Sequence, residues 1–385
     1  MTVAELQKLT REIADTILAR MDYSRELSDE DVRERILQEI RLSEREYYLT
    51  ATDKYTLARR TFDLLRKLGP LQPLIEDEQI SEIMVNGAEK IFIEKNGEME
   101  ELPDTFESEE QLEDVIQKVV AAHNRVVNEA NPIVDARLAD GSRVHVVLPP
   151  IALDGAVLTI RKFPKVPMTM ERLLSLGSLT EEMAAYLKMA VEDGRNMIVS
   201  GGTSSGKTSF LNALSSLIPP KERVILIEDS AELQVVGVEN LVRLETRNAN
   251  AAKQGEVSAA DLIRASLRMR PDRIIVGEVR DGAAAVNLLM AFNTGHIGQS
   301  TIHSNSAADT ISRLETLVLI GAGNIPLAAV RRQIASAVDI IVHLERRKDG
   351  RRCVAEIVEL EERQGEICLN RKFGGPDDDG AESSL

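Results

Sequence analysis

The chain has 385 residues, 43% of them hydrophobic and 29% charged, which is typical of a globular protein large enough for two or three domains. Its formal net charge of -16 argues against a general nucleic-acid or anionic-membrane surface, since both partners favour excess lysine and arginine, but it leaves room for a local basic patch. Aromatic residues make up 3% and tryptophan is absent, so few side chains could stack on the bases of single-stranded nucleic acid.

Composition also bears on the compartment in which the protein works. No run of about 18 consecutive apolar residues is present, which is the length that a membrane-spanning helix needs. The N-terminal stretch MTVAELQKLTREIADTI carries too many charges for a signal peptide, so we expect a cytoplasmic protein. Cys353 and Cys368 lack metal-ligand spacing, and in a reducing compartment we expect them to be packed thiols.

Residues 1–68 have the pattern of an all-helical module. Apolar residues recur at three- and four-residue intervals along the first predicted helix. Two capping boxes, Ser28 with Asp31 and Ser43 with Glu46, predict where two further helices begin. Two interpretations stay open for this module: a docking or regulatory part, and a simple surface appendage.

Residues 69–165 have the pattern of a small mixed α/β domain. Two strand-like runs, EIMVNG and IFIEKNGEME, come first, and Asn96-Gly97 predicts a tight hairpin turn. A helix with an apolar side begins near Ser108, and a second hairpin pattern surrounds Asp140-Gly141. A proline-containing stretch then indicates a linker, which we place at residues 166–175.

Residues 176–372 alternate between helix-like and strand-like segments. The strand-like runs are almost continuously apolar, which is typical of parallel strands covered by helices on both faces: NMIVS, VILIED, LVRLET, RIIVGE, STIH and DIIVHL. The segment CVAEIVELEERQGEICLNRKF has the pattern of a closing hairpin. Residues 373–385 are polar and acidic, and we expect this tail to be disordered.

The sequence GGTSSGKT at 201–208 matches the phosphate-binding pattern G-x-x-x-x-G-K-[ST]. It lies between a predicted strand and a predicted helix, where backbone N–H groups at a helix N-terminus cradle a polyphosphate. Lys207 would reach the β- and γ-phosphates, and the Thr208 hydroxyl would bind Mg²⁺. The alternative, a Ser/Gly-rich loop that binds nothing, does not account for the lysine in register, so we predict a bound nucleoside triphosphate. The nucleotide-binding residues predicted here are Gly202, Thr203, Ser204, Ser205, Gly206, Lys207, Thr208 and Ser209.

Two of the predicted strands end in acidic residues, at the edge where α/β sheets carry their ligands. RIIVGE ends in Glu278, which we predict to act with Thr208 at the metal, through the metal's water shell. VILIED is followed by SAE, and there Glu232 is the predicted general base that orients the attacking water. Either glutamate could instead cap a helix.

Two histidines, His296 and His303, flank a short strand in the segment TGHIGQSTIHSNSA. A single histidine is more often a buried structural residue than a catalyst. Two of them beside the sheet that carries the acids favour sensing of the γ-phosphate, so both are predicted catalytic residues. Metal ligation is not expected, because no cysteine or acidic partner lies at ligand spacing.

Arginine is the remaining requirement, because an oligomeric ATPase needs a cation that cancels transition-state charge, often from a neighbouring subunit or domain. The candidates are Arg143 and Arg161 in the preceding domain, Arg243 and Arg247 in LVRLETRN, and Arg280. Most surface arginines are solvated or ion-paired, and the sequence does not select among these five.

Four segments, in order along the chain, resemble the motifs of the secretion ATPases of the type II/type IV secretion and type IV pilus superfamily. GGTSSGKT is similar to the family's Walker A motif, IEDSAE to its acidic box, RPDRIIVGEVRD to its Walker B motif and TGHIGQSTIH to its histidine box. Upstream, LGPLQPLIEDEQISEIMVNG and LPPIALDGAVLTIRKF resemble the tight-adherence (Flp) pilus assembly branch, the CpaF-like proteins. The resemblance covers about residues 68–360.

The resemblance implies an N-terminal α/β domain joined to a RecA-like P-loop ATPase domain with a mostly parallel sheet. The protein would assemble as a homohexamer, peripheral to the inner membrane on its cytoplasmic face. ATP would lie between the two domains. Hydrolysis would then move an inner-membrane platform protein that adds pilin subunits.

The same resemblance implies roles for individual residues. Lys207 and Thr208 match the positions at the phosphates and the metal, Glu232 the catalytic carboxylate and Glu278 the Walker B acid. His296 and His303 match the positions of the histidine box. Arg143 and Arg161 match arginines that reach the nucleotide from the N-terminal side.

Three other functions stay open at this point. A nucleic-acid translocase on a RecA-like core is opposed by the acidic charge and the scarcity of aromatic residues. A P-loop kinase is disfavoured by the long segment ahead of the phosphate-binding loop. A nucleotide-gated scaffold would bind ATP without hydrolysing it, and release of inorganic phosphate separates it from a motor.

Overall fold

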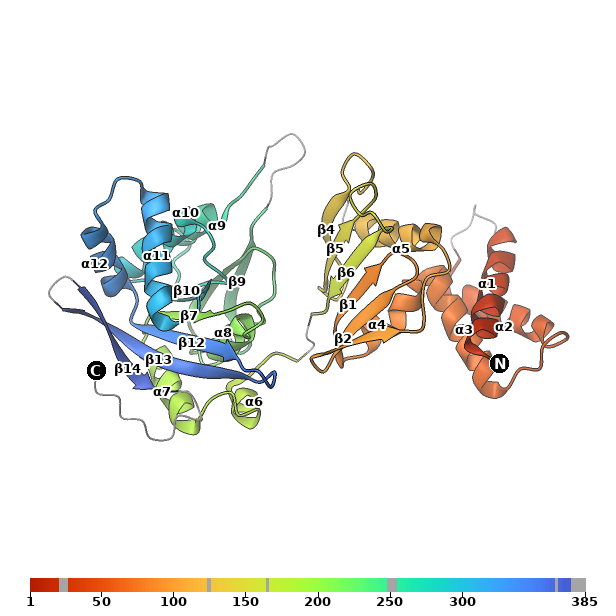
Figure 1. The fold of residues 1–385 in the computed structure, drawn as a ribbon, viewed down its shortest axis with the longest axis horizontal. Coiled ribbons are helices and arrows are strands. Elements are labelled where there is room, and N and C mark those ends of the chain that lie inside the picture. Colours follow the sequence, from red (N-terminus) through yellow and green to blue (C-terminus); the bar gives the residue numbers. More distant parts are fainter. Residues whose placement is uncertain (21–26, 123–125, 164–165, 248–254, 364–365, 375–385) are drawn as a thin grey trace. The chain divides into compact units, whose positions relative to one another are not determined.

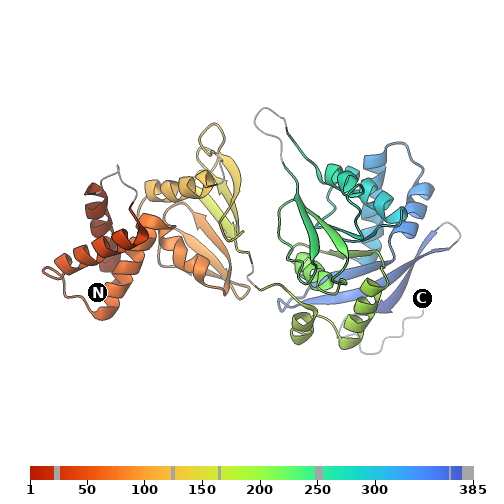
Figure 2. The same ribbon diagram turned by 180° about the vertical axis from the view of Figure 1, so that it is seen from behind.

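The chain divides into two compact units, Met1–Lys165 and Val166–Leu385. This computed structural model describes residues 1–20, 27–122, 126–163, 166–247, 255–363 and 366–374. Figure 1 shows the elements of each unit, and Figure 2 shows them from behind.

Three helices begin the first unit, and each starts with a capping box. They are α1 (Val3–Ala19), α2 (Asp29–Ser43) and α3 (Ala51–Arg66). In each box a Ser or Thr side chain and an acid three residues later bond each other's backbone N–H groups, which satisfies donors that the helix itself leaves free. The apolar faces of the helices pack into one cluster that includes Ile13, Ile36 and Leu57. The helix predicted from apolar spacing is α1, and it is confirmed.

One of the predicted helix starts is wrong. The capping box at Ser28 is confirmed, but Ser43 ends α2 instead of beginning the next helix. The Ser43 hydroxyl donates to the Glu39 carbonyl of its own helix at 3.0 Å, so it does not cap. Thr50 caps α3, because its side chain accepts from the Asp53 N–H at 3.1 Å and the Asp53 carboxylate accepts from the Thr50 N–H at 3.0 Å.

A six-stranded antiparallel sheet completes the first unit, in the order β3-β2-β1-β6-β5-β4. Its strands are β1 (Ile80–Asn86), β2 (Ile91–Lys95), β3 (Glu98–Leu102), β4 (Ile133–Arg137), β5 (Arg143–Val147) and β6 (Val157–Arg161). Both predicted hairpins are confirmed, with turns at Asn96-Gly97 and Asp140-Gly141. Helix α5 (Glu109–Ala121) packs Leu112 and Ile116 into the core of this sheet. The short helices η1 (Gly69–Leu71) and α4 (Gln72–Glu76) precede β1.

An eight-stranded sheet forms the centre of the second unit, in the order β14-β13-β12-β7-β11-β10-β8-β9. The strands from β12 to β9 are parallel, and β13 and β14 continue the sheet as an antiparallel hairpin, as the sequence predicts. The strands are β7 (Met197–Gly201), β8 (Arg223–Glu228), β9 (Asn240–Glu245), β10 (Arg273–Val276), β11 (Ile297–His303), β12 (Ile340–Arg346), β13 (Arg352–Arg363) and β14 (Glu366–Phe373).

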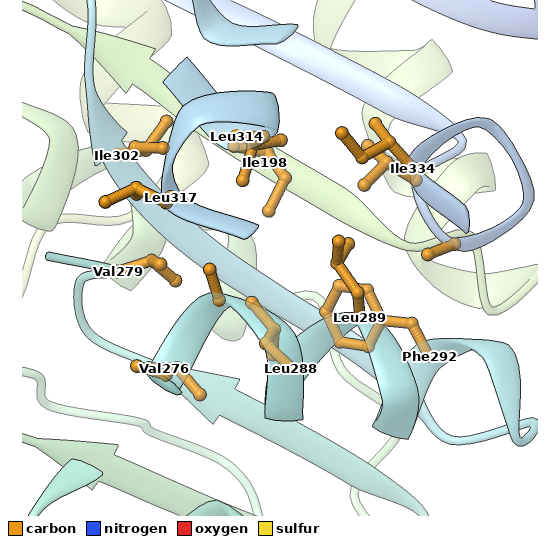
Figure 3. Close-up of a cluster of buried hydrophobic side chains, with 14 of the residues drawn as sticks. Ile198, Val276, Val279, Leu288, Leu289, Phe292, Ile302, Leu314, Leu317 and Ile334 are labelled. Atoms are coloured by element: carbon orange, nitrogen blue, oxygen red, sulfur yellow. The ribbon is translucent and has the colours of Figure 1, made fainter. Parts of the chain in front are cut away.

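Helices cover both faces of this sheet (Figure 1). One face packs against α6 (Met170–Ser175), α7 (Glu181–Glu192) and α8 (Lys207–Ser215). The other packs against α9 (Ala259–Ser266), α10 (Gly282–Asn293), α11 (Ala307–Ala322) and α12 (Leu327–Ala337). Figure 3 shows the second interface, where Leu288 and Phe292 of α10 meet Leu314 of α11 and Ile198 of β7.

The structure differs from three expectations at the borders of the second unit. The segment 166–175, expected as a linker, contains α6, because Thr169 caps a helix there whose Met170 and Leu173 are buried in the core. Strand β9 lies at the sheet edge and its residues are half-buried or exposed, whereas burial on both faces was expected. Of the expected disordered tail, Phe373 belongs to β14, and the part from residue 375 lies outside the described residues.

Within the described ranges no single helix is both long and apolar enough to span a membrane. Helices α11 and α12 taken together have the length and the apolar composition of a span, but the pair is bent by 118°.

Helices α10 and α11 approach each other too closely for a β-carbon at Gly282. Such an atom would lie 2.5 Å from the Gly321 nitrogen and 2.5 Å from the Leu317 carbonyl oxygen, both in the backbone of α11. We expect Gly282→Ala to lower the free energy of unfolding by about 1–3 kcal/mol, because forcing the helices apart outweighs the better helix propensity of alanine. Thermal or denaturant unfolding measures this change.

The matched control is Ala283→Ser, one residue along the same helix turn, where the side chain is exposed. That change should stay within about 0.5 kcal/mol of the parent. An alanine at 282 that proved as stable as the parent would contradict the close helix crossing.

Candidate functional site

The phosphate-binding sequence forms a curled loop between β7 and α8. Ser204 has φ 59° and Gly206 has φ 94°, so the loop enters the left-handed backbone region on its way into the helix. Glycine adopts this region at little cost because it lacks a β-carbon. The N-terminus of α8, with its free N–H groups, therefore follows directly on the end of β7, which is a favourable place for an anion.

Lys207 is buried, and its ammonium turns back onto this loop. Nζ donates to the Gly201 carbonyl at 3.0 Å and to the Gly202 carbonyl at 2.8 Å, and lies 3.2 Å from Nδ1 of His303. Burial lowers the pKa of Lys207, and the nearby Glu278 carboxylate opposes this shift. These direct partners are neutral, and no carboxylate among the described residues lies within ion-pair distance of Nζ. An anion would complete the surroundings of the ammonium.

His303 connects the loop to the acidic residues. It pairs in register with Gly201 across β11 and β7, so its side chain lies beside the loop. Nε2 is 3.1 Å from Oε1 of Glu278, while Nδ1 faces Lys207. A neutral imidazole satisfies both contacts, because Nδ1 accepts from the ammonium and Nε2–H donates to the carboxylate. Burial, and then the charge of Lys207, lower the pKa of His303, which favours this neutral form.

Arg280 and Asp229 extend the series. Arg280 Nε donates to Oε2 of Glu278 at 2.8 Å, and Nη1 lies 3.2 Å from Oδ2 of Asp229. We call this series the polar ladder: Lys207, His303, Glu278, Arg280 and Asp229. Its members follow or end β7, β11, β10 and β8, which are adjacent parallel strands, so all of them reach the same edge of the sheet.

Glu228 fixes the loop that carries Glu232. It is the buried last residue of β8, and its Oε1 accepts from the N–H groups of Glu232 and Leu233, each at 2.8 Å. Burial raises the pKa of Glu228, and these two hydrogen bonds oppose the rise. The sequence predicts Glu232 as an acid of the site but does not indicate that Glu228 positions its backbone.

His296 does not join this group within one chain. It precedes β11, at the end of the strand opposite to His303, and its Nδ1 lies 3.3 Å from the Thr294 hydroxyl and 3.3 Å from the Ala291 carbonyl. A strand rises about 3.3 Å per residue, so the two histidines are roughly 20 Å apart. Of the two, only His303 reaches the loop.

The predicted arginines are spread over both units. Arg243, within the edge strand β9, and Arg247, two residues after it, each donate to a main-chain carbonyl, at 3.4 and 2.5 Å, rather than to the phosphate-binding loop. Arg143 and Arg161 lie opposite each other on β5 and β6 of the first unit, where Arg161 Nε is 3.7 Å from Glu82.

The residues of the loop fit a polyphosphate with a magnesium ion. The Ser205 hydroxyl is buried, and its Oγ has no hydrogen-bond partner among the described residues. The described parts of the chain contain no group of three or more His, Cys, Asp or Glu side chains that could hold a metal. The Thr208 hydroxyl could bind a Mg²⁺ ion together with phosphate oxygens, and Glu278 could act through its water, since this ion usually keeps several water ligands. The other predicted loop residues are exposed or half-buried at its rim: Gly202, Thr203, Ser204, Gly206 and Ser209.

Two residues that contact this region were not predicted. Arg352 on β13 donates Nε–H to the Ser204 carbonyl at 2.9 Å. His343 on β12 is buried with Nδ1 2.9 Å from the Ser200 hydroxyl, one residue before the loop. These partners are 148 and 143 residues apart in the chain, so no local spacing could have signalled them.

Comparison with known proteins identifies the family to which this chain belongs. The conjugal transfer protein TrbB of Rhizobium radiobacter is 36% identical over 292 residues, which cover 74% of this chain and 85% of TrbB. The type IV secretion system protein PtlH of Bordetella pertussis is 32% identical over 317 residues, covering 75% and 93%. The fold is similar to that of the Legionella pneumophila ATPase DotB, with a TM-score of 0.56 at 21% identity, covering 75% of this chain and 79% of DotB. The model of the family described as type II/IV secretion system protein matches residues 65–374, and the chain belongs to this family.

Proposed function

We propose that this protein is a cytoplasmic ATPase motor, which couples ATP hydrolysis to pilus assembly or protein secretion through an inner-membrane platform protein. The observation that carries the proposal is the polar ladder, which begins at the Lys207 ammonium in a phosphate-binding loop and reaches Glu278 through His303. In this proposal the second unit is a RecA-like P-loop ATPase domain. Membership of the secretion family supports the same assignment.

The loop would hold the triphosphate of ATP. Lys207 would exchange the carbonyls of Gly201 and Gly202 for phosphate oxygens, and an anion at Nζ favours the charged form of the lysine that burial disfavours. Thr208 would hold Mg²⁺, and Glu278 would bind its water shell. The ion supplies charge neutralisation on the phosphate oxygens.

Hydrolysis would need one carboxylate to align and deprotonate water, and Glu232 is our candidate. The water oxygen attacks the γ-phosphorus while the bond from that phosphorus to the bridging oxygen breaks, and the electron pair stays on ADP. The proton that the water loses passes to the Glu232 carboxylate, and the products are ADP and inorganic phosphate. Glu228 would keep Glu232 in place, and His303 would sense the γ-phosphate through its contacts with Lys207 and Glu278.

The finer assignment is to the tight-adherence (Flp) pilus branch, as a homohexamer peripheral to the inner membrane. The upstream segments LGPLQPLIEDEQISEIMVNG and LPPIALDGAVLTIRKF support this branch. Arg143 and Arg161 of the first unit, and Arg243 and Arg247 of the second, stay candidates for contact with the nucleotide.

Nucleic-acid translocation is a second candidate, because the relative TrbB is named a conjugal transfer protein. The net charge of -16 and the 3% aromatic content argue against a direct nucleic-acid contact along this chain. Turnover separates the two functions: stimulation by DNA and not by a platform-protein fragment would favour the translocase.

Three substitutions separate binding from hydrolysis. Lys207→Ala should weaken ATP binding about 10- to 100-fold, since a charge-assisted hydrogen bond contributes ~1.5–3 kcal/mol. Glu232→Gln and Glu278→Gln should leave binding largely intact and lower kcat about 10²- to 10⁴-fold, because the amide neither accepts the proton nor holds the metal's water shell as a carboxylate does. Fluorescent-nucleotide titration and phosphate release measure the two steps.

Glu239→Gln is the matched control, since Glu239 is exposed before β9, at the opposite end of the strands. It should change neither quantity. A parent protein that binds ATP with Mg²⁺ and releases no phosphate would contradict the motor and support a nucleotide-gated scaffold.

Assembly provides an independent measurement. With ATP and Mg²⁺ we expect light scattering or native mass spectrometry to give six times the mass of one chain, because motors of this kind act as rings. The Lys207→Ala variant should need more nucleotide to reach the same state. A particle that stayed monomeric at saturating nucleotide would contradict the ring.

A further inference from the structure

The hairpin between β12 and β13 carries a cluster of positively charged side chains, although the protein as a whole is acidic. Its tip, residues 346–352, reads RRKDGRR, in a chain whose net charge is -16. The turn is ordered by its own hydrogen bonds: the Arg347 N–H donates to the Arg351 carbonyl at 2.8 Å and the Gly350 N–H to the Arg347 carbonyl at 2.9 Å. Asp349 accepts from the backbone N–H of Arg351 at 3.0 Å and from its side-chain Nε at 2.6 Å. These hydrogen bonds fix the backbone of the turn and hold the Arg351 side chain on Asp349.

This hairpin approaches the phosphate-binding loop closely at two places. A β-carbon on Gly201 would lie 2.4 Å from the Leu344 carbonyl oxygen of β12. A β-carbon on Gly206 would lie 3.2 Å from Cδ of Arg352, and Nε of the same arginine donates to the Ser204 carbonyl at 2.9 Å. Both ends of the loop, and its left-handed residue Ser204, therefore contact the β12–β13 hairpin.

We propose that Arg352 is a positioning residue for nucleotide binding, which holds the phosphate-binding loop in its anion-accepting curl from the outside. The proposal rests on the function proposed above, because it assumes that a nucleoside triphosphate binds this loop. Arg352 would act on the backbone of Ser204 and Gly206, and not on the substrate.

The peptide unit between Ser204 and Ser205 explains how the contact acts. A peptide carries its C=O and its N–H on opposite sides. Arg352 holds the Ser204 carbonyl on the outside of the loop, so the Ser205 N–H faces the other way, where it makes a long contact of 3.4 Å to the Gly202 carbonyl. A donor in such a long bond is readily transferred to a phosphate oxygen.

The left-handed conformation of Ser204 is the reason that the loop needs this support. A non-glycine residue with positive φ is strained and persists only where its surroundings hold it. The guanidinium provides a charged donor to its carbonyl, and the Cδ methylene packs on Gly206 beside it. Without Arg352, the loop would populate other shapes, and the nucleotide would have to select the binding-competent one.

A neighbour in the same turn provides the matched control. Arg351 carries the same charge on the same tip, but its side chain pairs with Asp349 instead of the loop. Arg351→Ala therefore removes the same charge without removing the contact to Ser204. If only the positive potential of the tip mattered, the two arginines would be equivalent.

The experiment compares Arg352→Ala, Arg352→Lys and Arg351→Ala with the parent, using titration with fluorescent ATP and ADP analogues and steady-state phosphate release. Because Arg352 is exposed, we expect a moderate effect: Arg352→Ala should raise Kd for both nucleotides, and KM for ATP, by about 3- to 10-fold. Its kcat at saturating ATP should stay within twofold of the parent, since the arginine touches no reacting atom. Arg352→Lys keeps a charged donor and should recover part of the affinity, and Arg351→Ala should match the parent.

Several results would overturn the inference. The first is a Kd of the Arg352→Ala variant within twofold of the parent value. The second is an Arg352→Ala variant in which only kcat falls. The third is an Arg351→Ala variant that loses as much nucleotide affinity as Arg352→Ala. Circular dichroism and the unfolding midpoint identify a variant that simply fails to fold, and Arg352→Lys then provides the comparison. A parent protein that bound no nucleotide at all would overturn the proposed function together with this inference, whereas the other results leave that function standing.

Discussion

The candidate site of the second unit depends on how the buried ammonium of Lys207 is held. Burying a charge is costly unless a partner of opposite sign is present, and here the direct partners are two main-chain carbonyls and an imidazole. The next member of the polar ladder after His303 is the carboxylate of Glu278, so the imidazole lies between the ammonium and the carboxylate. A direct pair of Lys207 with Glu278 would satisfy both charges and close the loop to an anion. The interposed imidazole prevents that closure.

This arrangement is possible because four parallel strands end at one edge of the sheet. The strand leading into the loop, β7, is buried along its whole length, and hydrophobic clusters on both faces hold it in register. A shift by one residue would exchange the faces to which its side chains point. The precision of the ladder therefore comes from the packing beneath it, and from Glu228, which holds the neighbouring loop through two backbone N–H groups.

What could be predicted from the sequence follows from how local each signal is. The loop motif and the apolar strands depend on neighbouring residues, so the parallel sheet and the position of Lys207 were predictable. The capping signal at Ser43 was also local, but it was misleading, because the same Ser43 hydroxyl can instead donate to a carbonyl of the helix before it. His296 and His303 are close in sequence, yet the rise of an extended strand separates them. The contact of Arg352 with Ser204 depends on how strands that are distant in the chain pack together, and the spacing of residues in the sequence does not indicate such a contact.

The position of β7 within its sheet has a consequence for how the unit fluctuates. It lies between β12 and β11 and is far from both open edges, β14 and β9. Local opening of a sheet begins where backbone groups are exposed, as at an edge strand such as β9, in which no residue is fully buried. Amide hydrogens should therefore exchange with solvent fastest at the two margins and slowest along the central strands. The loop at the end of β7 is therefore attached to the part of the sheet that opens least, and two strands separate β7 from β14 while three separate it from β9.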